Sequence, residues 1–175
     1  MTKKAILIIV VLLGAATALW YRDHYKQAAV YQTPYVPHAL FYTDPQGVFM
    51  FEYTNGFQVS GRDGSVLARV KVLKSHMPST NFSEAEFTIT STSGATDTTC
   101  SGRSDSAEAA AGNRYETTTI KKIYDGDCYV FEYIIHSTNI QNYDPSQGIK
   151  EFDKKKMVAD LEDIVLSFKY LVNSD

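Results

Sequence analysis

The sequence lacks the strong signatures of catalysis and nucleotide binding. It has no Walker loop, no dinucleotide glycine fingerprint, no HExxH, no CxxC, no G-x-S-x-G and no EF-hand loop. These absences argue against the common enzyme classes. We therefore predict no catalytic residue, no metal ligand set and no cofactor.

Charge is missing from one long stretch near the N-terminus. No charged residue occurs from Ala5 to Trp20, and Lys3 and Lys4 precede this apolar run. The bias of positive charge toward the cytoplasm places the N-terminus inside and sends the remainder of the chain outward. The first twenty residues also contain no cysteine, which argues against a lipid-modified N-terminus.

The apolar run is compatible with two kinds of segment, a membrane anchor that is retained and a signal peptide that is cleaved. Sixteen helical residues cover roughly 24 Å, slightly less than a hydrocarbon layer of about 30 Å. Small residues around Ala18 match a signal-peptidase site, whereas Trp20 and Tyr21 are rings that lie at membrane interfaces. We favour a single-pass anchor over residues 1–22, with cleavage near Ala18 as the alternative that leaves a secreted or periplasmic protein.

Basic residues and cysteine are both scarce in the remainder. Without Lys3 and Lys4, 15 of the 17 basic residues face 20 acidic ones, a net charge of −5. Such an acidic chain is a poor nucleic-acid binder, because nonspecific affinity comes from neutralised phosphates.

Cys100 and Cys128 are expected to form a disulfide outside the cytoplasm.

The remaining chain reads as a stalk followed by one domain. Residues 23–45 are rich in proline and tyrosine without a steady period, which is typical of a connecting segment. Residues 46–175 alternate in the manner of β-strands and end in an amphipathic helix over residues 151–168. The predicted fold is α+β, a mainly antiparallel sheet with this helix packed on one face. Residues 48–60 are predicted as a hairpin or a tight strand–turn–strand.

Two segments carry more specific predictions. The strand from Cys128 to His136 is apolar on both faces, so we expect it to be central and covered on both sides. Residues 91–112 are small and polar, which predicts a flexible insert with at most one helical turn.

Three residues are candidates for a binding site. Glu132 lies on an apolar face of the central strand, where a carboxylate must be paired or open to a cleft. His136 ends that strand, and His76 lies in a loop. A hydrolase would require one of these histidines within hydrogen-bond distance of an acid or hydroxyl in a pocket. An inhibitor of a hydrolase would need a protruding loop, for which residues 91–112 are the candidate.

Both ends of the predicted domain resemble a known family. The segment from Gly47 to Tyr53, GVFMFEY, and the segment LSFKY after the helix resemble the opening strand and the closing segment of the bacterial relatives of PsbP. Thr54 and Phe57 depart from the proline and tryptophan of that pattern. The resemblance implies an antiparallel sheet with helices on its faces and a binding or assembly role without known catalysis, and it transfers no catalytic residue.

We therefore predict a non-catalytic binding or accessory module of the cell envelope. Its partners would be the membrane, through the N-terminal helix, and an envelope protein or polymer, with no nucleic acid. The alternative is a small secreted hydrolase or an inhibitor of one.

Overall fold

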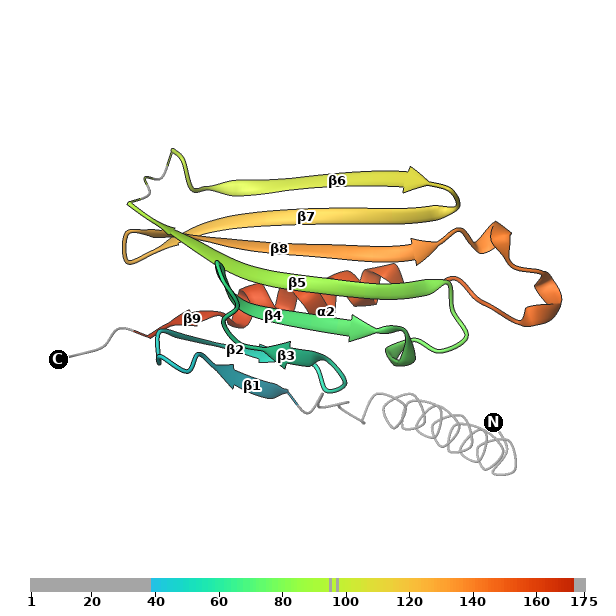
Figure 1. Ribbon diagram of the computed structural model, residues 1–175, viewed down its shortest axis with the longest axis horizontal. Coiled ribbons are helices and arrows are strands. Elements are labelled where there is room, and N and C mark those ends of the chain that lie inside the picture. The colour runs from blue at the N-terminus through green and yellow to red at the C-terminus, as the bar shows by residue number, and fades with distance from the viewer. Residues whose placement is uncertain (1–38, 95, 97, 172–175) are drawn as a thin grey trace, which may run out of the picture. The chain divides into compact units, whose positions relative to one another are not determined.

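The computed structural model describes residues 39–94, 96 and 98–171 (Figure 1). The predicted membrane segment, residues 1–22, lies outside this range, as does most of the predicted stalk. Within the range, no helix has both the length and the apolar character needed to cross a bilayer.

The domain is built around an antiparallel six-stranded sheet. Its order is β3-β4-β5-β8-β7-β6 (Figure 1). The strands are β3 (Gln58–Ser60), β4 (Val66–Leu73), β5 (Phe82–Ser93), β6 (Gly102–Ala110), β7 (Asn113–Tyr124) and β8 (Asp127–Thr138). Three 3₁₀ turns lie in the connections: η1 (Lys74–His76), η2 (Ile140–Asn142) and η3 (Pro145–Gln147).

A smaller sheet and one helix complete the described domain. The three-stranded sheet has the order β1-β2-β9, with β1 (Leu40–Thr43), β2 (Phe49–Tyr53) and β9 (Lys169–Tyr170). The helix is α2 (Lys154–Ser167), which begins at an Asp153 cap whose carboxylate accepts a hydrogen bond from the Lys156 backbone N–H. The α+β prediction, with a C-terminal helix on the sheet, is confirmed.

One face of the large sheet carries the core. Alternate residues of the strands point to this face, and the apolar stripe of α2 packs against them. Phe49 and Phe51 of β2 contribute from the small sheet, and the ring of Phe49 stacks on that of Phe168 with centroids 5.2 Å apart. Residues of α2 that are buried in this core are Met157, Leu161, Ile164 and Val165.

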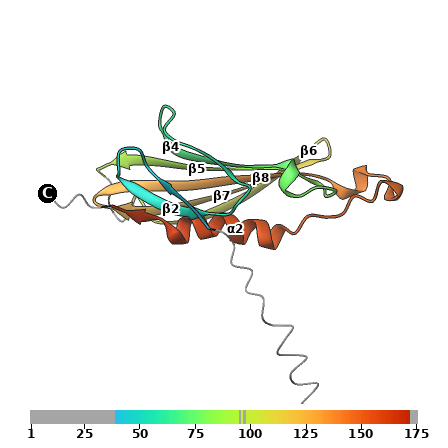
Figure 2. The ribbon, with the colours of Figure 1, turned by 90° about the horizontal axis from the view of Figure 1, so that it is seen from below.

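The prediction that the central strand is covered on both sides is wrong. β8 is central, between β5 and β7, but α2 and β2 lie on the same side of the sheet, and no helix or strand of the described chain covers the other side (Figure 2). On that open face Ile134 is 37% exposed and Val130 is half-buried. The apolar residues there are interspersed with threonines of the neighbouring strands, such as Thr88 and Thr119.

The prediction of a flexible insert over residues 91–112 is also wrong. Residues 91–93 end β5, and residues 102–110 form strand β6, which pairs with β7 in unbroken register from Gly102 opposite Lys121 to Ala110 opposite Asn113. The sequence of β6 shows no alternation of apolar and polar residues, because neither side of this strand is buried and every residue is exposed. Pairing with β7 overrides the weak local preference of this segment.

One further boundary differs from the sequence prediction. Leu40–Thr43, within the predicted stalk, forms β1 because it pairs with β2. Residues 48–60 are a strand–turn–strand, the second of the two predicted arrangements, since β2 joins the small sheet and β3 pairs with β4. The short strand β9 after the helix also pairs with β2.

The predicted disulfide is present. Cys100 and Cys128 are bonded, with Cα atoms 5.5 Å apart, and both side chains are buried. The bridge joins the segment before β6 to the start of β8. It therefore fastens the edge of the sheet to its centre.

Candidate functional site

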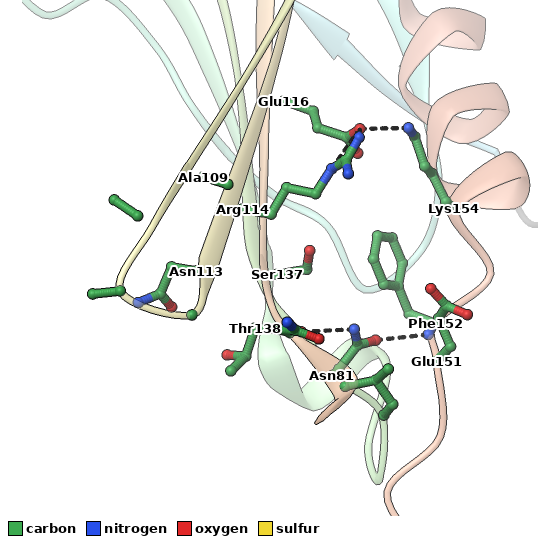
Figure 3. Close-up of a pocket in the computed structure, with 15 residues that line it drawn as sticks. Asn81, Ala109, Asn113, Arg114, Glu116, Ser137, Thr138, Glu151, Phe152 and Lys154 are labelled. Atoms are coloured by element: carbon green, nitrogen blue, oxygen red, sulfur yellow. Dashed lines mark hydrogen bonds and ion pairs between the residues drawn. The ribbon is translucent and has the colours of Figure 1, made fainter. Parts of the chain in front are cut away.

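A cleft of about 620 Å³ lies at one end of the six-stranded sheet (Figure 3). It forms where the β6–β7 hairpin, the end of β8, the residue before β5 and the segment leading into α2 meet. Its lining is mixed, with alanines of the hairpin on one side and polar side chains on the other. Residues that line it include Asn81, Ala109, Ala110, Asn113, Arg114, Glu116, Ser137, Thr138, Glu151, Phe152 and Lys154.

Three charged side chains converge on one wall of the cleft (Figure 3). Glu116 Oε1 accepts hydrogen bonds from Lys154 Nζ at 2.6 Å and from Arg114 Nη2 at 2.7 Å. Arg114 and Glu116 lie two residues apart on β7 and so point to the same face, whereas Lys154 begins α2. Burial alone would raise the pKa of Glu116, but the hydrogen bonds from Lys154 and Arg114 outweigh it, and the net direction is downward.

Asn81 braces the base of the cleft. Its side-chain Nδ2 donates to the backbone oxygen of Thr138 at 2.7 Å, and its Oδ1 accepts from the backbone N–H of Phe152 at 2.9 Å. The side chain therefore ties the end of β8 to the segment that precedes α2 (Figure 3). Asn81 is buried, and a buried amide with both ends bonded fixes the surrounding backbone.

A second pocket, of about 410 Å³, adjoins the cleft between β6, β7 and α2. Glu116 and Lys154 line both cavities. At the far end, Glu162 of α2 accepts from Arg103 at 2.6 Å and from the Tyr133 hydroxyl at 3.0 Å. Burial and the acceptor Glu162 raise the pKa of the Tyr133 phenol. The two cavities adjoin along the inner side of the β6–β7 hairpin, and together they are called the groove below.

The groove suits a polar ligand held by hydrogen bonds. Its wall charges Arg114, Glu116 and Lys154 are engaged with one another. Hydroxyls of Ser137 and Thr138 share the lining with alanine methyls, and Asn113 borders it with its Oδ1 3.0 Å from His136 Nε2. Such groups match the hydrogen-bonding surface of a peptide backbone or a carbohydrate.

The predicted site residue His136 lies outside this cleft, on the open face of the sheet. Its ring stacks on Tyr115 with centroids 4.3 Å apart and an interplanar angle of 11°. Its Nε2 is 3.0 Å from Asn113 Oδ1, and its Nδ1 is 3.9 Å from Glu84 Oε1, beyond hydrogen-bond distance. The histidine is held by packing and by an amide.

His76 and Glu132 lie elsewhere in the domain. His76 ends η1 and packs edge-on against Phe57, with ring centroids 5.2 Å apart. Its ring fills the space beside Gly56, where a Cβ atom would approach Nδ1 to 2.9 Å. Glu132 accepts a hydrogen bond from Thr119 Oγ1 at 3.2 Å on the open face. Neither residue lines the cleft, and the three predicted residues do not form one site.

The arrangement required by the hydrolase hypothesis is not found in the described part of the chain. Neither His76 nor His136 is in the groove or within hydrogen-bond distance of an acid there. No group of three or more histidine, cysteine, aspartate or glutamate side chains in this part is arranged to hold a metal ion. Of residues 91–112, the candidate protruding loop of an inhibitor, residues 102–110 are strand β6. The predicted anchor residues Ala5, Trp20 and Tyr21 lie outside the described residues.

The cleft residues were missed from the sequence. Lys154 stands in a run of three lysines and Asn81 precedes β5, and neither position by itself indicates a cavity. One signal was available in β7, whose inward positions read Ile120, Thr118, Glu116 and Arg114 toward the hairpin. Because an inward face that turns from apolar to charged cannot continue a core, this change marks where the core ends and a cavity begins.

Comparison with known proteins finds a likeness among solved structures. No family profile and no curated protein sequence matches this chain. Among solved structures, the chain is similar to cyanobacterial PsbP (CyanoP) from Synechocystis sp. PCC 6803, with 12% sequence identity and a TM-score of 0.39. The match covers 77% of this chain and 94% of that chain. This is the family that the two end motifs of the sequence resemble, and the match transfers no functional residue.

Proposed function

We propose that this chain is a non-catalytic binding module of the cell envelope, tethered outside the cytoplasm by its N-terminal segment. The observation that carries the proposal is the groove beside the β6–β7 hairpin, with its amide, hydroxyl and alanine lining and its internally paired charges. A groove of this kind binds by hydrogen bonding and shape.

The location is supported by the disulfide and the N-terminal sequence. Disulfides persist in oxidising compartments and are rare in the cytosol. The uncharged run behind Lys3 and Lys4 has the charge order of an exported segment. Protein recovered from the envelope should show no free thiol at Cys100 or Cys128 without reduction. Free thiols in exported material would contradict the location.

The partner is an extended segment of an envelope protein, or an envelope polymer of comparable width. Both present repeated donors and acceptors to the amides and hydroxyls of the groove. The acidic net charge of the chain favours an uncharged or weakly basic partner over an anionic one.

Site-specific photo-crosslinking in the cells that make the protein tests the proposal. Benzoylphenylalanine at Glu151, on the rim of the cleft, is expected to give an adduct of discrete size. The same probe at Ser60, exposed on β3 at the other edge of the sheet, is the matched control. Digestion of the adduct with a protease or a glycan hydrolase distinguishes a protein from a polymer.

A cleft-filling variant completes the test. Ala109→Trp places an indole in the cleft from an exposed strand position and should abolish the Glu151 adduct. Equal labelling from Ser60, or an adduct at Glu151 that survives Ala109→Trp, would contradict binding in the cleft. The absence of any adduct at Glu151 would do so as well.

A further inference from the structure

The two edges of the six-stranded sheet differ in how they avoid pairing with other chains. Proteins protect edge strands by making them short or by placing lysine, proline or a bulge in them. At one edge, β3 has three residues. At the other, β6 has nine residues, GRSDSAEAA, without lysine or proline, and its register with β7 is unbroken. The β6 edge therefore lacks shortness, lysine, proline and a bulge. Of the charged residues that can also protect an edge it has Arg103, Asp105 and Glu108, and the first two are already paired within one copy of the chain.

The side chains of β6 leave its backbone accessible. All nine residues are exposed, and six of them are glycine, alanine or serine. The strand is nevertheless well fixed: Asp105 accepts a hydrogen bond from Thr118 at 2.6 Å, and Arg103 pairs with Asp105 and with Glu162 of α2. Cys100, just before the strand, is bonded to Cys128. A preformed edge is ready to accept a strand without a large ordering cost.

The hairpin decides which backbone groups face outward. The β6–β7 turn has two residues, Ala111 and Gly112, both with positive φ, so its closing pair of Ala110 and Asn113 is hydrogen-bonded. Since pairs alternate along an antiparallel ladder, alternate residues of β6 direct their N–H and C=O groups away from β7. The residues with outward backbone groups are Arg103, Asp105, Ala107 and Ala109.

We propose that β6 pairs with β6 of a second copy of this chain, in an antiparallel register centred on Ser106. The two-fold axis is perpendicular to the sheet, and the two six-stranded sheets become one of twelve strands. In this register the four outward residues pair among themselves, with Asp105 opposite Ala107 and Arg103 opposite Ala109. All nine residues of each strand are matched.

Charge and strand length favour this register over its neighbours. Centred on Ser106, the register places Glu108 opposite Ser104, so no like charges lie directly opposite one another. If the register were shifted so that its centre lay at Asp105, the Asp105 residues of the two copies would face one another, which is destabilising. A shift to a centre at Ala107 would leave Arg103 opposite the turn residue Ala111 and lose its pair. The pairing lies beyond the binding function proposed above, and it brings two grooves to the same side of one continuous sheet, because β6 lines both cavities.

Cysteine substitution on the open face tests the register. Facing Ser106 residues form a non-hydrogen-bonded pair with Cα atoms about 4.5 Å apart, a distance that a disulfide spans. In the full-length chain, Ser106→Cys should give a covalent dimer under mild oxidation. Ser104→Cys is the matched control, since its copies would lie about 14 Å apart along the strands. Peptide mapping establishes that Cys100 and Cys128 remain bonded in both variants.

Charge substitution provides a second measurement, by sedimentation equilibrium. Ser106→Lys opposes two lysines and should raise the dimer dissociation constant at least about tenfold, whereas Ser104→Lys faces Glu108 of the other copy and should not raise it. A monomer at every concentration, equal crosslinking of the two cysteine variants, or a dimer unaffected by Ser106→Lys would each overturn the proposal. Crosslinking of Ser106→Cys alone, with the predicted order of the lysine variants, would support it.

Discussion

Arg62 donates two hydrogen bonds to the buried carboxylate of Asp44, from Nε to Oδ1 at 3.1 Å and from Nη2 to Oδ2 at 3.2 Å. The Asp44 side chain is fully buried, whereas that of Arg62 is 33% exposed. Asp44 follows β1 in the small sheet, and Arg62 lies in the turn from β3 to β4 of the large sheet. The pair therefore fixes the two sheets to one another. Loss of Arg62 would leave a buried carboxylate, whereas loss of Asp44 would leave a partly exposed guanidinium.

Removing Arg62 should destabilise the protein more than neutralising Asp44. Arg62→Met leaves a buried carboxylate without its cation and is expected to lower the free energy of unfolding by about 3–5 kcal/mol. Asp44→Asn leaves a guanidinium that water reaches, and should cost about 1–3 kcal/mol. Urea unfolding of the two variants measures the difference.

Arg69 provides the control for that comparison. It pairs with Glu86 on the open face, where both side chains are about one-third exposed. Arg69→Met should change the free energy of unfolding by less than about 1 kcal/mol. Equal losses for Arg62→Met and Arg69→Met would show that the burial of Asp44 has no energetic consequence.

Glu116 should make stability depend on acidity. Its pKa is held below the ordinary value of 4.5, so the folded form loses this contribution as the pH falls through the lowered pKa, and retains it fully above about pH 4.5. Glu116→Gln is expected to cost about 1 kcal/mol at neutral pH, because Lys154 is half exposed, and less in acid. A double-mutant cycle with Lys154→Met, measured by urea unfolding at neutral and acidic pH, should give a coupling energy that vanishes in acid. A coupling that persists in acid would contradict the ion pair.

The disulfide should contribute substantially to stability. It closes a sequence separation of 28 residues, for which the chain-entropy relation gives about 3–4 kcal/mol. The double variant Cys100→Ser and Cys128→Ser should unfold at lower urea, and backbone amides of β6 should exchange hydrogen faster than those of β8. Unchanged stability, or exchange that rises equally throughout the sheet, would mean that the bridge does not fasten the β6 edge.

Two leucines of α2 give a matched test of the core. Leu161 is fully buried and Leu166 is 76% exposed on the same helix. Leu161→Ala should cost about 2–5 kcal/mol through lost burial and a residual cavity, whereas Leu166→Ala should stay within about 0.5 kcal/mol. Thermal unfolding measures both, and similar losses for the two variants would contradict the orientation of the helix.

The sequence was sufficient wherever side-chain periodicity decides the structure. The amphipathic helix and the strand alternation within residues 46–175 follow from local chemistry, and both are present as expected. The Cys100–Cys128 pairing followed because the chain offers no other partner.

Where the sequence prediction failed, long-range pairing decides the structure. β6 has no apolar pattern because neither of its faces is buried, so only its ladder with β7 reveals it as a strand. Which faces of β8 are covered depends on where α2 and β2 pack, and the sequence of β8 does not determine this. Glu132 was judged from its own strand, whereas its hydrogen-bond donor Thr119 belongs to the neighbouring strand β7, a relationship that the sequence of β8 does not contain.

The inward face of β7 has two ends that should differ in their tolerance of amino-acid substitution. At one end Ile120 and Tyr124 pack against the core, while at the other Glu116 and Arg114 border open space. Variation at the second end would alter what the groove accepts without weakening the packed end. For the proposed binding module, recognition and folding are thus encoded in separate lengths of the same strand.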